Sequence, residues 1–325
     1  MADKDEKREV TTDDLKAARQ STKKSNMIAI AVAAVVIVAV ALFAAFGGKG
    51  EKKGDAGNAS TAAASTEAAA DGGSTSQART LDEIKASGTI NIGVFTDKAP
   101  FGYVDDQGQY QGYDVEFGNR LAQDLGVKVN YIATDAANRV PYLESNKVDV
   151  ILANFTVTDE RKDKVDFAKP YMKVSLGVVS PEGRLITNVD DLKGKTLIVT
   201  KGTTAETYFE KNYPEVNLQK YDQYADAYNA LLDGRGDAFS TDNTEVLAWA
   251  KSNPGFKVGI ETLGDVDTIA PAVHKGNDSV LNYINDEIDK LAGEQFFHKD
   301  YEKTLLPVYG DEVNPDDIVI EGGQL

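Results

Sequence analysis

The residues best suited to binding chemistry follow a buried strand in the middle of the chain. Residues 148–153 are apolar apart from Asp149, and the polar turn after them carries Thr156, Thr158 and Arg161. Two hydroxyls, the free N–H groups of a helix start and a guanidinium together suit a small carboxylate. The segment therefore predicts capture of a small acid, and amino acids are the commonest ligands of that kind.

A carboxylate follows a second predicted strand, 238–241, at Asp242. Alone, such a residue is most often a turn residue or a helix N-cap. If it faces Arg161 across a cleft, the guanidinium can bind an α-carboxylate as a bidentate pair and Asp242 an α-ammonium. Ligands of open α/β sheets sit beyond the carboxyl ends of the strands, so these two strand ends favour a clamp for an amino acid.

Three further positions have both a structural and a functional interpretation. Thr203 and Glu206 are spaced as a capping box, which alone predicts only a helix cap, but with Gly202 the turn also suits an anion. Phe101 could stack on a ligand, although a phenylalanine is more often a core residue. Arg139 begins a predicted helix, where a cation opposes the helix dipole, and this mild conflict hints at a functional placement.

The elements that must position these residues alternate between strands and helices from residue 81 onward. The predicted strands are 89–95, 127–132, 148–153, 196–199, 216–221 and 238–241. The predicted helices are 114–125, 136–145, one from about 205, 222–232, and one that carries Leu281, Ile284, Ile288 and Leu291. This alternation predicts an α/β fold with mostly parallel sheets, and its two similar series predict two lobes.

Composition excludes several classes of protein. The 325 residues suffice for one large or two ordinary domains, and 42% apolar residues allow a packed core. A net charge of −17 argues against a nucleic-acid partner, and the lack of cysteine excludes disulfides, thiolate metal sites and a lipid anchor on an N-terminal cysteine. His274 and His298 lack metal-ligand spacing, and no phosphate loop or nucleophile elbow occurs, so we expect no metal, cofactor or catalytic residue.

The N-terminal region predicts a membrane anchor and a tether. Residues 27–46 are apolar over about 20 residues, the length that crosses a hydrocarbon core. A retained transmembrane anchor is favoured over a cleaved signal, although residues 45–47 could form a cleavage site. Flanking basic residues weakly favour a cytoplasmic segment 1–26, and the acidic remainder is placed most simply outside the cell. Residues 47–80, rich in Gly, Ala, Ser and Thr, predict a flexible linker.

From about residue 81 to 325 the chain resembles extracellular solute-binding proteins of polar amino-acid ABC transporters. The matching blocks are GVFTDKAPFGY (93–103), GYDV (112–115), ANFTVTDER (153–161), KGTT (201–204), TDNT (241–244) and IAPAV (269–273). The ending, with EQFFHK (294–299) and IVIEGG (318–323), looks most like the cysteine-binding branch. One departure is that Gram-positive members usually carry a lipobox cysteine, which this chain lacks.

The resemblance implies a two-lobed, periplasmic-binding-protein-like (type II) fold that closes on its ligand. Two crossover strands, near 172–178 and 265–269, would join lobe 1 (81–173 plus 270–325) to lobe 2 (174–269). The implied ligand-binding residues are Phe101, Arg139, Asn154, Thr156, Arg161, Thr204 and Asp242. Among them, Arg161 and Thr156, aided by Thr204, would hold the α-carboxylate, and Asp242 would hold the α-amino group.

The identity of the ligand depends on the remaining positions of this set. Phe101 and its neighbours would wall the side-chain pocket, and Arg139 matches a position that binds a side-chain carboxylate in aspartate- and glutamate-binding relatives. Cysteine therefore leads by overall likeness, glutamate or aspartate follows from Arg139, and glutamine remains possible. We expect a monomeric, membrane-tethered receptor with an extracellular binding domain that delivers an amino acid to an ABC permease. The alternatives are an enzyme on the same fold (dehydratase or lytic transglycosylase) and a surface adhesin or sensor.

Overall fold

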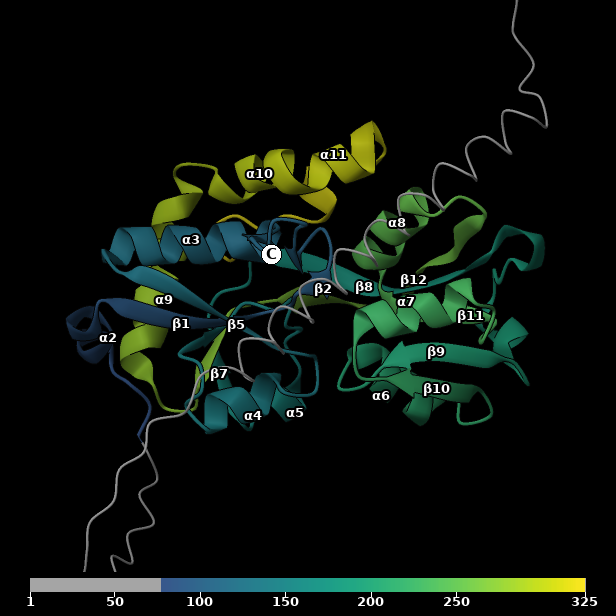
Figure 1. The fold of residues 1–325 in the computed structure, drawn as a ribbon, viewed down its shortest axis with the longest axis horizontal. Helices are drawn as coiled ribbons and strands as arrows, with labels where there is room; N and C mark the ends of the chain where they lie inside the picture. Colours follow the sequence, from purple (N-terminus) through teal and green to yellow (C-terminus); the bar gives the residue numbers. More distant parts are fainter. Residues whose placement is uncertain (1–76, 325) are drawn as a thin grey trace, which may run out of the picture. The chain divides into compact units, whose positions relative to one another are not determined.

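Two five-stranded sheets organise residues 77–324, the part of the chain that this computed structural model describes (Figure 1). The first sheet has the strand order β5-β1-β6-β13-β7, and the second has the order β10-β9-β11-β8-β12. A small third sheet has the order β2-β3-β4. We call the first sheet with its helices and the small sheet the first lobe, and the second sheet with its helices the second lobe. The prediction of a two-lobed α/β fold is confirmed.

Parallel pairing of β1 with β5 and β6 forms the centre of the first lobe, and β13 joins antiparallel to β6 and β7. The strands are β1 (Thr89–Val94), β2 (Asp97–Lys98), β3 (Gly102–Val104), β4 (Tyr110–Gln111), β5 (Lys128–Ala133), β6 (Val150–Ile151), β7 (Val165–Phe167) and β13 (Ala272–His274). The helices are α2 (Leu81–Ser87), α3 (Tyr113–Leu125), α4 (Arg139–Glu144), α5 (Asp159–Lys162), α9 (Asp278–Ala292), α10 (Phe296–Asp300) and α11 (Leu306–Tyr309). One π-helical turn, Tyr301–Leu305, and two 3₁₀ turns, Gly310–Glu312 and Pro315–Asp317, complete this lobe.

The second lobe repeats the alternation of strands and helices. Its strands are β8 (Met172–Pro181), β9 (Thr196–Thr200), β10 (Asn217–Tyr221), β11 (Ala238–Asp242) and β12 (Phe256–Ile269). Its helices are α6 (Thr204–Asn212), α7 (Tyr224–Leu232) and α8 (Asn243–Ser252), with 3₁₀ turns at Glu182–Arg184 and Val189–Leu192. Strand β9 pairs parallel with β10 and β11, whereas β8 pairs antiparallel with β11 and β12.

The predicted strand 148–153 is shorter than expected, since only β6 has strand conformation. The backbone N–H groups of Asp149 and Leu152 still donate to carbonyl oxygens of Asn91 and Gly93, both at 2.9 Å. The segment therefore runs along β1 for its whole length, and the polar turn begins at the carboxyl end of the sheet as predicted.

Helix α3 shows how one glycine sets the distance between helix and sheet. Gly118 lies on the buried face of α3, where a Cβ atom would come within 2.9 Å of the Tyr131 hydroxyl on β5. The missing side chain thus lets α3 lie directly on the sheet. Gly126, with a φ of 75°, ends the helix and donates its N–H to the Ala122 carbonyl, as glycine C-caps do.

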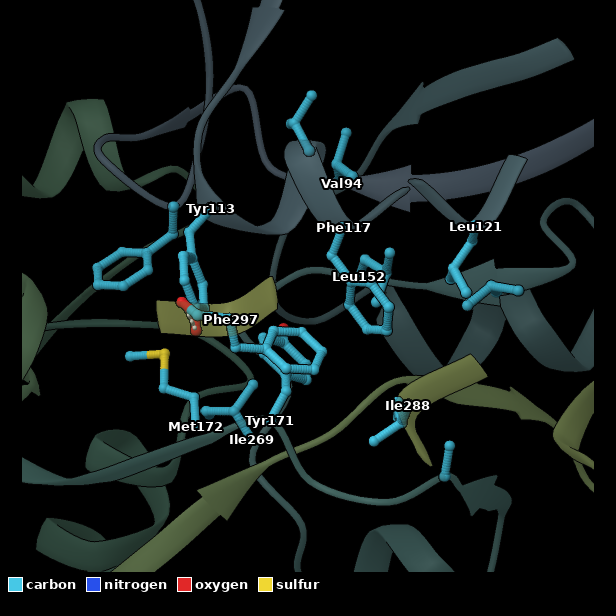
Figure 2. Close-up of a cluster of buried hydrophobic side chains, with 14 of the residues drawn as sticks. Val94, Tyr113, Phe117, Leu121, Leu152, Tyr171, Met172, Ile269, Ile288 and Phe297 are labelled. Carbon is cyan, nitrogen blue, oxygen red and sulfur yellow. Dashed lines mark hydrogen bonds between the residues drawn. The ribbon is translucent and has the colours of Figure 1, made fainter. Parts of the chain in front are cut away.

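The core of the first lobe extends to the strands that connect the lobes (Figure 2). The Phe117 and Phe297 rings meet edge to face at 4.9 Å, and Tyr171 stacks on Phe297 at 5.6 Å. Met172 and Ile269 belong to the same buried cluster. Because these two residues begin β8 and end β12, the core holds the inter-lobe connections in place.

The chain passes between the lobes twice, from β7 into β8 and from β12 into β13. Met172 pairs with Ile269 in the antiparallel ladder, and Figure 1 shows the two strands running side by side. The predicted crossover segments 172–178 and 265–269 lie in these strands. The exact lobe boundaries stay a prediction.

The predicted cytoplasmic segment 1–26, the membrane segment 27–46 and the linker as far as residue 76 lie outside the described residues. Within residues 77–324, no helix has both the length and the apolar character to cross a membrane. The last residues of the predicted linker are bound to the first lobe. Arg79 Nε donates to Asp149 Oδ1 at 2.9 Å, and the Thr80 hydroxyl accepts the N–H of Glu83 at the start of α2.

Candidate functional site

The turn from Thr156 to Arg161 has the local geometry that the sequence predicts. The Thr158 hydroxyl caps the short helix α5 by accepting the Arg161 N–H at 3.3 Å. The Arg161 side chain folds back over its own turn, so that Nη1 donates to the Thr156 carbonyl oxygen at 2.7 Å. Its guanidinium carbon lies 4.7 Å from the centre of the Phe155 ring. These contacts fix the guanidinium at the edge of the first sheet.

Arg161 is held in an environment that disfavours its positive charge. Burial, and to a lesser extent the nearby charge of Arg139, lower the pKa of Arg161 to about 9, while Asp242 opposes the shift. Nη2 donates to the Gly202 carbonyl of the second lobe at 3.0 Å. Within residues 77–324, its side-chain hydrogen bonds end on backbone carbonyls. A bound carboxylate would supply the counter-charge that this guanidinium lacks.

The guanidinium of Arg139 is hydrogen-bonded to backbone carbonyl oxygens. Its Nε donates to the Ala136 carbonyl, Nη1 donates to those of Ala153 and Asn154, and Nη2 donates to that of Gly202, all at 3.0–3.1 Å. The donors of Arg139 are thus bonded to carbonyl oxygens in this arrangement, and its binding of a ligand carboxylate stays a prediction. Through these hydrogen bonds, the guanidinium links the end of the first sheet to the second lobe.

At Gly202 the backbones of the two lobes lie close together. Its φ of 76° suits glycine, and a Cβ atom there would lie 2.6 Å from the Ala137 Cα. In the turn that follows, the Thr203 hydroxyl accepts the Glu206 N–H at 3.2 Å, while Glu206 Oε2 accepts the Gly202 N–H at 2.6 Å. Thr204 is half-buried and begins α6. The predicted cap is present, and it presents Thr204 next to the glycine that contacts both arginines.

Asp242 ends β11 and, although it is the N-cap residue of α8, its side chain makes no capping bond. Its Oδ2 atom instead accepts from Lys98 Nζ at 3.1 Å and from Asn154 Nδ2 at 3.4 Å. Asn154 has a φ of 44°, and its Oδ1 atom is buried without a hydrogen-bond partner. Two side chains of the first lobe thus meet the carboxylate of the second.

Lys98 is the residue that sequence reasoning missed. It is 1% exposed, and its ammonium also pairs with Glu245 Oε2 at 2.8 Å. Burial alone would lower the pKa of Lys98, but Asp242 and Glu245 hold it well above its ordinary value. The only signal in the sequence was its position in the segment after the first strand, where a lysine would ordinarily remain in solvent.

Three aromatic rings surround these charges. The Lys98 ammonium lies 4.6 Å from the centre of the Tyr224 ring and 5.4 Å from that of Phe95. The Arg139 guanidinium lies 4.5 Å from the centre of the Phe155 ring. Cations over aromatic faces are stabilised when water is excluded, so the rings help to keep buried charges ionised.

Phe101 lies in the core of the first lobe, and its part in the wall of a side-chain pocket stays a prediction. It is 0% exposed and belongs to the core cluster of the first lobe, together with Val94 and Tyr113. Its carbonyl oxygen would lie 2.3 Å from a Cβ atom at Gly112, which shows how tightly this turn packs. Here the phenylalanine supports the β2–β3 turn, and the aromatic wall next to the charges comes from Phe95, which ends the predicted first strand.

A buried carboxylate, that of Asp114, accepts a hydrogen bond from the backbone of Asn154. Asp114 Oδ2 accepts the Asn154 N–H at 2.8 Å, and Asp114 Oδ1 accepts the Tyr171 hydroxyl at 2.5 Å. Burial raises the pKa of Asp114 to about 6 despite these bonds. The left-handed backbone of Asn154 is therefore held by a hydrogen bond to its own N–H group.

Residues of both lobes also line a cavity of about 370 Å³ that includes Arg161 and Gly202. A volume of this order is typical of small-molecule sites. No group of three or more His, Asp or Glu side chains within residues 77–324 is arranged to hold a metal ion. Of the predicted site residues, Arg161 lines this cavity, whereas Thr156, Thr204 and Asp242 lie outside its lining. Taken together, the described residues around it offer guanidiniums, hydroxyls and a carboxylate, which are groups that bind a small zwitterion.

Comparison with known proteins gives a consistent result. The sequence profile of the bacterial extracellular solute-binding proteins, family 3, matches residues 90–306. The crystal structure of a cysteine-binding protein from Campylobacter jejuni is 54% identical, with a TM-score of 0.73, over 74% of this chain and 98% of that one.

Two further relatives agree with this result. A structure of the solute receptors for L-cysteine of Neisseria gonorrhoeae is also 54% identical, with a TM-score of 0.74, over 75% of this chain and 100% of that one. The L-cystine-binding protein of Escherichia coli K12 is 32% identical, over 65% of this chain and 80% of its own length.

Proposed function

This chain belongs to family 3 of the bacterial extracellular solute-binding proteins, and we propose that it captures a small amino acid between its lobes for an ABC permease. The observation that carries the proposal is the arrangement of opposite charges at the lobe interface. Arg161 is a largely buried guanidinium bonded to carbonyl oxygens, and Asp242 is a buried carboxylate that faces the other lobe. An α-amino acid carries the complementary pair of charges.

The proposed binding mode pairs each charged group of the ligand with a protein group of opposite charge. The ligand carboxylate pairs with the Arg161 guanidinium and accepts hydrogen bonds from the hydroxyls of Thr156 and Thr204. The ligand ammonium takes the Asp242 carboxylate, beside the Asn154 amide. Contacts from both lobes favour the closed state when ligand is bound, because only then are all of them made together.

Cysteine is the first candidate ligand, and glutamine is the next. Support comes from the two 54% identical structures, which are of a cysteine-binding protein and of solute receptors for L-cysteine. Aspartate and glutamate move to last place, because the Arg139 donors that their side chains would need are bonded to carbonyl oxygens. The side chain of cysteine needs no charged partner in the pocket. This agrees with an Arg139 whose donors are bonded to carbonyl oxygens.

Attachment and delivery belong to the same proposal. The receptor acts as a monomer outside the cell, held at the membrane through its N-terminal segment, and it releases its ligand on docking to the permease. The described contacts single out no enzyme or adhesin activity, so binding for transport remains the proposed function.

Calorimetric titration of the full-length protein with each common L-amino acid tests the proposal. We expect cysteine, kept reduced, to bind most tightly and D-cysteine to bind far more weakly, because the clamp reads the configuration at Cα. If none of the amino acids binds, the proposed function is wrong.

A further inference from the structure

A buried lysine of the first lobe ends between two carboxylates of the second. Lys98 Nζ lies 2.8 Å from Glu245 Oε2 and 3.1 Å from Asp242 Oδ2. It also donates to the Tyr224 hydroxyl at 3.2 Å. This ammonium therefore occupies the place that the proposed function assigns to the ammonium of the ligand.

The three charged side chains do not balance one another. Lys98 contributes one positive charge, whereas Asp242 and Glu245 contribute two negative charges when ionised. The Asn154 amide and the Tyr228 hydroxyl donate hydrogen bonds to these carboxylates, but both groups are neutral. Buried charges need compensation, so this cluster, which we call the ammonium pocket, has capacity for one further cation.

We infer that Lys98 and Glu245 set this capacity. When the ligand binds, its ammonium forms an ion pair with Asp242, and Lys98 keeps only its ion pair with Glu245. The inference rests on the proposed function and deepens it. Lys98 is then a specificity-determining residue, because with Lys98 in place the pocket accepts one ligand ammonium and repels a second cation on the ligand side chain.

The geometry makes this exchange easy. Lys98 Nζ already lies closer to Glu245 than to Asp242, and its bond to the Tyr224 hydroxyl does not depend on Asp242. Glu245 is itself held by the Tyr228 hydroxyl, so it is fixed in the place where it receives the ammonium. A small shift of one flexible side chain then frees Asp242.

A charge cycle on the full-length protein tests the inference. Affinities for L-cysteine and for L-ornithine, whose side chain is cationic, are measured by calorimetry for four proteins: wild type, Lys98→Met, Glu245→Gln and the double variant. Burial raises the pKa of Glu245 to about 7, with Lys98 opposing the shift, so the titrations are done at about pH 8. Another neutral amino acid replaces cysteine if the wild type prefers it.

The cycle predicts opposite changes in the single variants. Lys98→Met shifts the ratio of affinities toward ornithine by at least about tenfold, because two carboxylates are left for the ligand. Glu245→Gln weakens cysteine binding by at least about tenfold, because Lys98 then stays on Asp242. The double variant restores the net charge and returns both affinities to within about threefold of the wild type.

Lys193→Met is the matched control, since Lys193 is exposed and pairs with Asp190 away from the site. Thermal unfolding checks the fold of each variant. If Lys98→Met does not fold, Glu245→Gln is sufficient as a test, because undiminished cysteine affinity in that variant overturns the inference. An unchanged ratio in Lys98→Met, or a double variant weaker than both single variants, overturns it too while the proposed function stands. A wild type that binds no amino acid refutes both.

Discussion

Two charge clusters connect the lobes, and they are built in opposite ways. At Gly202, the guanidiniums of Arg139 and Arg161 bond to backbone carbonyls, so positive charge is in excess. At Asp242, one ammonium from Lys98 meets two carboxylates, so negative charge is in excess. A zwitterion placed between the clusters would reduce both excesses at once. The difference between them is thus what makes the cleft suited to an amino acid rather than to a simple anion or cation.

The largest effect is expected at the positive cluster. Arg161→Ala should reduce affinity for the best amino acid by on the order of 3 kcal/mol or more, because the ligand carboxylate is left buried without a partner. Calorimetry measures the loss, and Arg184→Ala, at an exposed arginine of the second lobe, is the control. Retained affinity in Arg161→Ala would place the carboxylate elsewhere.

A smaller loss is expected at the negative cluster. Asp242→Asn should weaken binding by on the order of 2 kcal/mol, since the amide oxygen still accepts a hydrogen bond from the ligand ammonium but the charge is gone. Asp222→Asn, at an exposed residue paired with Lys201, serves as the matched control. If both variants bind alike, Asp242 does not hold the ammonium.

Within the positive cluster, Arg139 should behave differently from Arg161. Arg139→Ala removes the Arg139 donor from the carbonyl oxygens of Ala136, Ala153 and Asn154, while that of Gly202 keeps its bond from Arg161, so the free energy of unfolding should fall by about 2 kcal/mol or more in denaturant titrations. The ratio of glutamate to cysteine affinity should not change. A selective loss of glutamate binding would restore Arg139 as a receptor for a side-chain carboxylate.

The smallest expected effect is a pH dependence of the negative cluster. Lys98 on β2, Tyr228 on α7, Thr241 and Asp242 on β11 and Tyr309 on α11 face Glu245. Its pKa is about 7 without ligand, raised by burial and opposed by Lys98, and a Lys98 ammonium that is no longer shared with Asp242 would lower it on binding. Binding then releases protons, so affinity should fall by less than about tenfold from pH 8 to pH 6.

Calorimetry in buffers of different ionisation enthalpy measures this proton release directly. Glu245→Gln removes the titrating group and should remove the release. Proton uptake by the wild type would contradict the exchange of Lys98 between the two carboxylates.

Local patterns made part of the site predictable. Thr203 caps its helix as its spacing from Glu206 indicates, because a cap involves residues three apart. Asp242 ends β11, Arg161 lies in the short helix that follows β6, and the rule for open α/β sheets brings the carboxyl ends of strands to one edge. Phe101 was not assignable in the same way, because a phenylalanine after a strand suits a core and a pocket wall equally well.

The sequence by itself determined the alternation of strands and helices, the caps and the polar strand ends, since all of these depend on neighbours within a few residues. Only the tertiary structure decided that Lys98 meets Asp242, 144 positions away, and that Arg139 is committed to carbonyl oxygens of both lobes. The physical reason is that the cost of burying a charge depends on which groups the fold brings beside it, and those partners come from the other lobe.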